Sequence, residues 1–157
     1  MSWLRRKAQK ARMVMGTRMR RHDDRREWAF GGHEITRLLV DNRFEIEVWW
    51  KDADLVTTAN FTIEAPFTIS TENAEHACDP EVKASLTPAL ALVGRPIESV
   101  AAFRNGLLSI KFADGSELRV PKRTDGFETW ESSGTGELHD IGMLCSSHEV
   151  SPWGGRA

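Results

Sequence analysis

The 157-residue chain has no tyrosine and only two cysteines, Cys78 and Cys145. Two cysteines are too few for a disulfide framework and are typical of free thiols in a reducing compartment. No apolar run approaches the roughly 20 residues that cross a bilayer, and no apolar signal segment follows the N-terminus. We therefore expect a cytoplasmic protein.

The sequence also lacks the motifs of common cofactor enzymes. It has no phosphate-binding loop ending in Gly-Lys-Ser or Gly-Lys-Thr, no G-x-S-x-G elbow, no H-E-x-x-H and no C-x-x-C. We therefore predict no catalytic residue and no cofactor.

The composition is that of one globular domain with an uneven distribution of charge. Hydrophobic residues make up 40% of the chain and charged residues 28%, which is enough for a core. Residues 1–26 contain ten Lys or Arg and two Asp, whereas residues 27–157 contain eleven bases and 21 acids. The net charge of −2 thus conceals a basic segment and an acidic body of charge −10.

Residues 1–27 show a helical pattern. Leu4, Ala8, Ala11, Met15 and Met19 recur at spacings of three and four, which places them on one helical face. We predict a basic amphipathic helix that docks on RNA, an anionic membrane surface or an acidic protein. A solvated extension and a transit peptide are alternatives. The predicted binding residues are Arg5, Arg6, Lys7, Lys10, Arg12, Arg18, Arg20 and Arg21.

From residue 28 the apolar residues alternate, which predicts β-strands. Thr87-Pro88 and Gly94 delimit a short buried helix. The segments 35–69 and 97–131 repeat one order of strands approximately. We predict an α+β fold, predominantly antiparallel β, with two meander-like repeats joined by the short helix. Residues 28–157 would form this single β-rich domain.

Two turn signals lie in the second repeat. Asn105-Gly106 and Asp114-Gly115 are typical of type I′ hairpin turns, which require positive φ angles. The tail over residues 134–153 predicts one more hairpin.

Four segments also carry a resemblance to a known family. They read ITRLLVDNRFEIEV, TPALALVGRPIESVAAFRNGLLSIKFADGSELRVP, FETWESSG and VSPW, and they extend from about Gly32 to Trp153. The chain resembles a family of small, mostly actinobacterial, β-rich proteins of unknown function. The resemblance implies a fold but transfers no catalytic residue.

Two polar groups are candidates for chemistry. His76, Cys78, Cys145 and His148 supply the number of ligands that a tetrahedral zinc site needs. The tight H-x-C spacing favours free thiols, so we predict no metal. Glu137, His139 and Asp140 suggest an acid–base cluster, but such triplets are more typical of a polar turn.

Trp49 is a candidate interface residue. The alternation from Phe44 to Trp50 points Trp49 outward, where a tryptophan can serve as a binding hot spot. Alternatively, the N-terminal helix or Trp28 covers it, and we favour this interpretation because sheets usually have something packed on them.

Three functions are consistent with these observations. The leading hypothesis is a non-enzymatic interaction module with an acidic body and a basic arm. The second is an immunity-like inhibitor whose acidic domain binds a basic toxin or nuclease. The third, an enzyme that uses carboxylates and histidine, lacks a recognised constellation.

Overall fold

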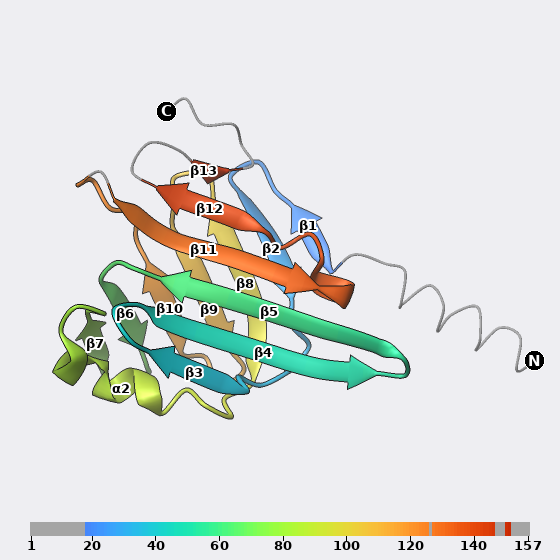
Figure 1. Ribbon diagram of the computed structural model, residues 1–157, viewed down its shortest axis with the longest axis horizontal. Helices are drawn as coiled ribbons and strands as arrows, with labels where there is room; N and C mark the ends of the chain where they lie inside the picture. The colour runs from blue at the N-terminus through green and yellow to red at the C-terminus, as the bar shows by residue number, and fades with distance from the viewer. Residues whose placement is uncertain (1–17, 126, 147–149, 152–157) are drawn as a thin grey trace, which may run out of the picture.

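The computed structural model describes residues 18–125, 127–146 and 150–151. In this part of the chain two antiparallel sheets lie face to face (Figure 1). The seven-stranded sheet has the order β1-β2-β8-β9-β10-β6-β7, and the six-stranded sheet has the order β13-β12-β11-β5-β4-β3. The predicted, predominantly antiparallel β fold is confirmed.

The elements of each sheet have the following bounds. The seven-stranded sheet contains β1 (Met19–Arg21), β2 (Arg25–Ala29), β6 (Phe67–Ser70), β7 (Glu75–Cys78), β8 (Ile97–Phe103), β9 (Leu108–Phe112) and β10 (Glu117–Val120). The six-stranded sheet contains β3 (Arg37–Val40), β4 (Phe44–Asp52), β5 (Leu55–Ile63), β11 (Glu128–Thr135), β12 (Met143–Ser146) and β13 (Val150–Ser151). The short helices are η1 (Lys83–Leu86), α2 (Thr87–Leu90) and η2 (Gly136–Leu138).

The two sheets are completed by an exchange of strands. Strands β3, β4 and β5 form a meander in one sheet, and β8, β9 and β10 form a meander in the other. The strand after each meander crosses to the opposite sheet, so that β6 pairs with β10 and β11 pairs with β5. Each half of the chain therefore supplies strands to both sheets.

The core lies between the sheets and follows the alternation in the sequence. On β4 the side chains of Phe44, Ile46, Val48 and Trp50 are buried, whereas Trp49 is exposed. The largest fully buried side chains are Trp28, Trp130, Phe30, Phe44, Phe61, Phe67 and Phe112. Burying one such side chain contributes about 1.5–3 kcal/mol, so this interior is the main source of stability.

The predicted connecting helix forms only in part. Residues 83–90 make the turns η1 and α2, with Pro88 in the first turn of α2. Leu86, Ala89 and Leu92 enter the core, but Leu90 and Val93 are exposed. The helix is thus buried on one side only.

The predicted N-terminal helix is wrong for residues 19–27. These residues belong to a β-hairpin in which Met19 pairs with Trp28. Strand β2 pairs with β8 from Arg25 to Ala29, and Trp28 is only 1% exposed. A helix could not offer its backbone groups to the edge of β8, so sheet pairing outweighs the helical periodicity. Residues 1–17, with the rest of the predicted helix, lie outside the described residues.

The two predicted hairpin turns exist, but they are not type I′. In the first turn Gly106 has a φ of +96° while Asn105 has no positive φ. The Gly106 amide donates to the Phe103 carbonyl, and the Phe103 amide donates to the Leu107 carbonyl. This is a type I turn followed by a left-handed glycine. The Asp114-Gly115 turn repeats the pattern.

Strand β7 lies within the acidic segment 71–82, whose sequence shows no alternation of apolar residues that would predict a strand. Here Phe67 and Ile69 of β6 pair with Cys78 and His76 of β7. Only Cys78 of this strand is buried, so the strand has almost no apolar pattern of its own.

A buried carboxylate at η2 joins the N-terminal hairpin to the six-stranded sheet. One oxygen of Glu137, Oε2, accepts hydrogen bonds from Arg18 Nε at 3.2 Å and Trp50 Nε1 at 3.3 Å, and it lies 3.1 Å from Arg18 Nη2. His33 stacks on the Trp50 ring with a centroid distance of 3.9 Å. Burial and the neighbouring Arg18 lower the pKa of His33, so its ring is neutral at pH 7.

The residues that follow Glu137 reinforce the same junction. Asp140 accepts a hydrogen bond from Trp28 Nε1 at 3.0 Å. His139 Nδ1 lies 3.0 Å from the Gly136 carbonyl. The contacts of Glu137, His139 and Asp140 are thus those of a structural turn.

Replacing Gly106 by Val should lower the free energy of unfolding by about 3 kcal/mol. A Cβ at this position would lie 2.7 Å from Lys122 Cβ, in addition to the strain of the positive φ. The matched control is Gly115→Val, where φ is +87° but the space is open; strain alone costs about 1–2 kcal/mol. Urea unfolding measures both, and equal losses would contradict the steric part of the argument.

Replacing Glu137 by Gln should destabilise the fold by about 2 kcal/mol, because Arg18 and Trp50 lose a charged acceptor. Arg18 is partly exposed, and solvent therefore compensates some of the loss. Urea unfolding at neutral pH, with the exposed Glu75→Gln as the control, measures the effect. A loss below about 0.5 kcal/mol, the range of neutral surface changes, would show that the carboxylate does not hold the hairpin.

Candidate functional site

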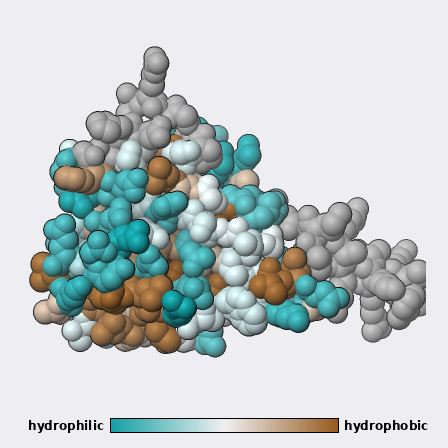
Figure 2. Space-filling view, in the orientation of Figure 1, coloured by the Kyte–Doolittle hydropathy of each residue, from teal (hydrophilic) through white to brown (hydrophobic). Residues whose placement is uncertain are grey.

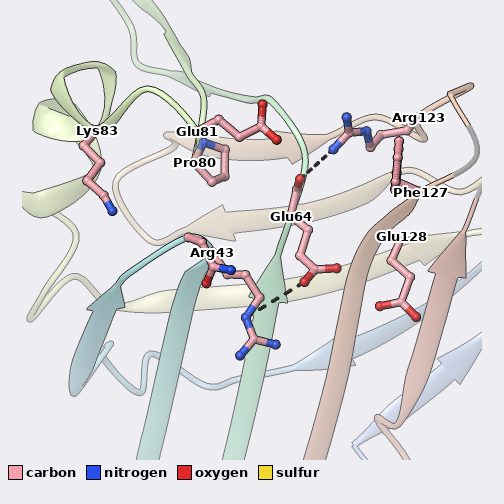
Figure 3. Close-up of a pocket in the computed structure, with 9 residues that line it drawn as sticks. Arg43, Glu64, Pro80, Glu81, Lys83, Arg123, Phe127 and Glu128 are labelled. Atoms are coloured by element: carbon pink, nitrogen blue, oxygen red, sulfur yellow. Dashed lines mark hydrogen bonds and ion pairs between the residues drawn. The ribbon is translucent and has the colours of Figure 1, made fainter.

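A cleft of about 660 Å³ opens at one end of the two sheets. Turns and loops that follow β3, β5, β7 and β10 meet there, together with the first residue of β11 (Figure 3). The lining residues are Asn42, Arg43, Glu64, Pro80, Glu81, Lys83, Arg123, Phe127 and Glu128. Three are basic and three acidic, so the cleft has both charges but no net excess.

Each cation of the cleft already has an oxygen partner. Arg43 lies 3.7 Å from Glu45 and 3.9 Å from Glu64. Lys83 donates to the Asp41 carbonyl at 2.6 Å. Arg123 binds Asp125 through Nε at 2.9 Å and donates to the Glu64 carbonyl at 2.8 Å. These cations therefore hold the walls of the cleft together.

The negative charges of the carboxyl groups in the cleft are less well compensated by cations. Figure 3 shows Glu64 between Arg43 and Glu128. Burial, the charge of Glu128 and a hydrogen bond to it raise the pKa of Glu64, while Arg43 lowers it. Glu131, on the same strand as Glu128, adds to the repulsion. The pair of Glu64 and Glu128 therefore favours an additional positive charge.

Phe127 gives the cleft an exposed aromatic wall. Its side chain is 65% exposed. The Arg123 guanidinium lies 5.6 Å from the ring centroid, within the range of a cation–π contact. A large aromatic residue in this position is costly to expose and typical of a binding surface.

An apolar patch borders the cleft. We define it as Leu39 and Val40 of β3 together with Val82, Leu90 and Val93, which are between 39% and 54% exposed. The segment 83–94, which contains η1 and α2, runs beside β3, because Lys83 donates to the Asp41 carbonyl and the Gly94 amide donates to the Ile35 carbonyl. Figure 2 shows hydrophobic surface gathered over β3 and α2.

The predicted arm residues fall into three groups. Arg5, Arg6, Lys7, Lys10 and Arg12 lie outside the described residues. Arg18 is engaged by Glu137 and is a structural residue. Arg20 and Arg21 are exposed on β1, an edge strand. The described part of the predicted arm is therefore most of a β-hairpin, on which Arg20 and Arg21 are exposed.

The zinc candidates are placed on different sheets. Cys78 ends β7 in the seven-stranded sheet, and Cys145 is on β12 in the six-stranded sheet. Burial raises the pKa of both thiols. His148 lies outside the described residues, and among those described no group of three or more His, Cys, Asp or Glu could hold a metal ion.

Trp49 is 49% exposed on the outer face of the six-stranded sheet. The interpretation that Trp28 covers it is wrong, because Trp28 lies on β2 in the core between the sheets. Trp49 pairs with Thr58, which pairs in turn with Thr135. Its role in an interface remains a prediction.

The sequence did not indicate the cleft. Arg43, Glu64, Arg123 and Glu128 come from separate turns and strands and share no motif. The one local signal is Phe127, an aromatic residue between the loop residue Asp125 and the acidic start of β11. Only the strand exchange brings these residues together.

Comparison with known proteins leaves the activity open. No curated protein and no solved structure matches the chain. Within the described residues, no helix is long and apolar enough to cross a membrane. The family of unknown function DUF6188 matches residues 26–148, a range that begins within β2 and includes the whole cleft. The chain belongs to this family of unknown function, DUF6188.

Proposed function

We propose that the chain is a non-enzymatic interaction module that binds a protein through the apolar patch and the neighbouring cleft. The observation that carries this proposal is the patch itself. Five large apolar side chains stay exposed on β3 and around α2, although the fold buries their neighbours Leu86, Ala89 and Leu92. Contiguous apolar surface beside a polar rim is typical of protein interfaces.

The charges of the described residues support a protein partner over a polyanion. The cations Arg18, Arg43 and Arg123 are paired with carboxylates, and Arg25 is paired with Asp24 and Glu27. Such arginines have little free charge to offer a phosphate backbone. Arg20 and Arg21 are the exposed bases of β1, and they define the polyanion alternative.

The immunity-like inhibitor is a second candidate within the same class. The charge of −10 over residues 27–157 favours a basic target. A toxin or nuclease with a basic surface would meet both the acidic body and the apolar patch.

Replacing Val93 by Asp should reduce capture of the partner protein at least about tenfold, because a charge would enter the apolar contact. The control is Val56→Asp, a valine next to the β4–β5 turn that is 40% exposed, against 53% for Val93. Immobilised full-length protein is exposed to a cell lysate, and the bound proteins are quantified by mass spectrometry. The proposal requires proteins that bind the wild type and Val56→Asp but not Val93→Asp.

Duplex RNA and phosphatidylserine vesicles serve as further probes. Two results together would overturn the proposal. An Arg20→Gln, Arg21→Gln variant would lose binding to RNA or to the vesicles, and Val93→Asp would capture the same proteins as the wild type. That result would instead support docking of the basic N-terminal segment on a polyanion.

A further inference from the structure

We propose that the cleft receives an arginine side chain of the protein partner, which Glu64, Glu128 and Phe127 of its lining recognise. This inference rests on the proposed function, since it specifies the chemistry of the protein that the module binds.

The shape of the cleft fits a side chain entering from a neighbouring protein. Its volume of about 660 Å³ is within the range of sites that hold small ligands, and it is therefore large enough for one long side chain and the adjoining backbone. The apolar patch borders it through Val82, which lies between the lining residues Glu81 and Lys83. A partner seated on the patch therefore reaches the cleft without crossing open solvent.

The Glu128 carboxylate of the cleft has no cation partner among the ion pairs of the described residues. Arg43, Lys83 and Arg123 are committed to Glu45, Glu64, Asp125 and the carbonyls of Asp41 and Glu64. Glu128 has no cation among these pairs, and it repels the neighbouring Glu64. A guanidinium group placed between the two carboxyl groups would remove this repulsion and offer each a charged donor.

Phe127 favours arginine over lysine. The contact of Arg123 with this ring shows that the surroundings of Phe127 accept a planar guanidinium. The ring remains 65% exposed, which leaves surface for a second one. Arginine stacks on aromatic rings and binds carboxylates with two parallel hydrogen bonds, whereas lysine offers a compact, strongly hydrated charge.

Binding should also release a proton. Glu64 faces Arg43 from the β3–β4 turn, Arg123 from the β10–β11 loop, and Glu128 and Glu131 from β11. Because the pKa of Glu64 is raised in the free protein, part of its population is protonated in weak acid. An incoming cation favours the ionised form, so affinity should rise as the pH rises through this pKa.

The test uses defined peptides and the full-length protein. A fluorescein-labelled peptide, Gly-Ser-Ala-Arg-Ala-Ser-Gly, is titrated by fluorescence anisotropy beside the same peptide with citrulline, the uncharged isostere, in place of arginine. The arginine peptide should bind at least about tenfold more tightly, as expected for a charge-assisted bidentate contact. Its affinity should be higher at about pH 7.5 than at about pH 5, where glutamates begin to protonate.

Two cleft variants and one control locate the contact. Glu128→Gln and Phe127→Ala, both at exposed positions, should abolish the preference for arginine over citrulline. Glu75→Gln removes the same charge from β7, outside the cleft, and should leave the preference unchanged. Equal binding of the two peptides by the wild type, or an equal loss in Glu75→Gln and Glu128→Gln, would overturn the inference.

The peptide titration and the capture experiment distinguish the arginine site from the apolar docking surface. The Val93→Asp variant keeps the cleft intact, so it should bind the arginine peptide like the wild type. If the peptide does not bind but Val93→Asp still loses the captured protein, the partner surface stands and the arginine site is wrong. If the peptide binds and the valine variants capture the same proteins, the cleft stands and the apolar patch is not the docking surface.

Discussion

The exchange of strands between the two sheets is the constraint on which the rest of the structure depends. Strand β6 leaves the first meander to pair with β10, and β11 leaves the second to pair with β5. Neither half can bury its apolar face without the other, because the core side chains of one meander need the opposite sheet as a cover. The cleft forms at the end of the molecule where these crossing connections meet.

Electrostatics at the two ends of the fold serve different purposes. At η2 a single carboxylate, Glu137, satisfies donors from Arg18 and Trp50 and fixes the N-terminal hairpin. In the cleft Glu64 lies beside Glu128, and the ion pairs of the described residues give a cation to Glu64 but not to Glu128. The donors around Glu137 find their acceptor within the chain, whereas the two carboxyl groups of the cleft would be neutralised by a bound cation.

Periodicity and turn chemistry were sufficient to predict the β class, the inward residues of β4 and the positions of Gly106 and Gly115. They were insufficient where a strand forms only because it pairs with a neighbouring strand. Met19 falls on a helical stripe, yet pairing with β2 makes it a strand. Strand β7 has one buried residue, and only β6 beside it defines it. The cleft residues come from distant turns, and no local pattern encodes their meeting.

The terminal strands of the two sheets differ in how they meet solvent. Strand β1 presents Arg20 and Arg21, and charged side chains on such an edge oppose the addition of a strand from another molecule. Strand β3 presents the exposed Leu39 and Val40, and Arg37 is the single charged residue among its four. Aggregation of the concentrated protein is therefore expected to begin at β3. A partner bound there would cover these apolar side chains and so keep the protein in solution.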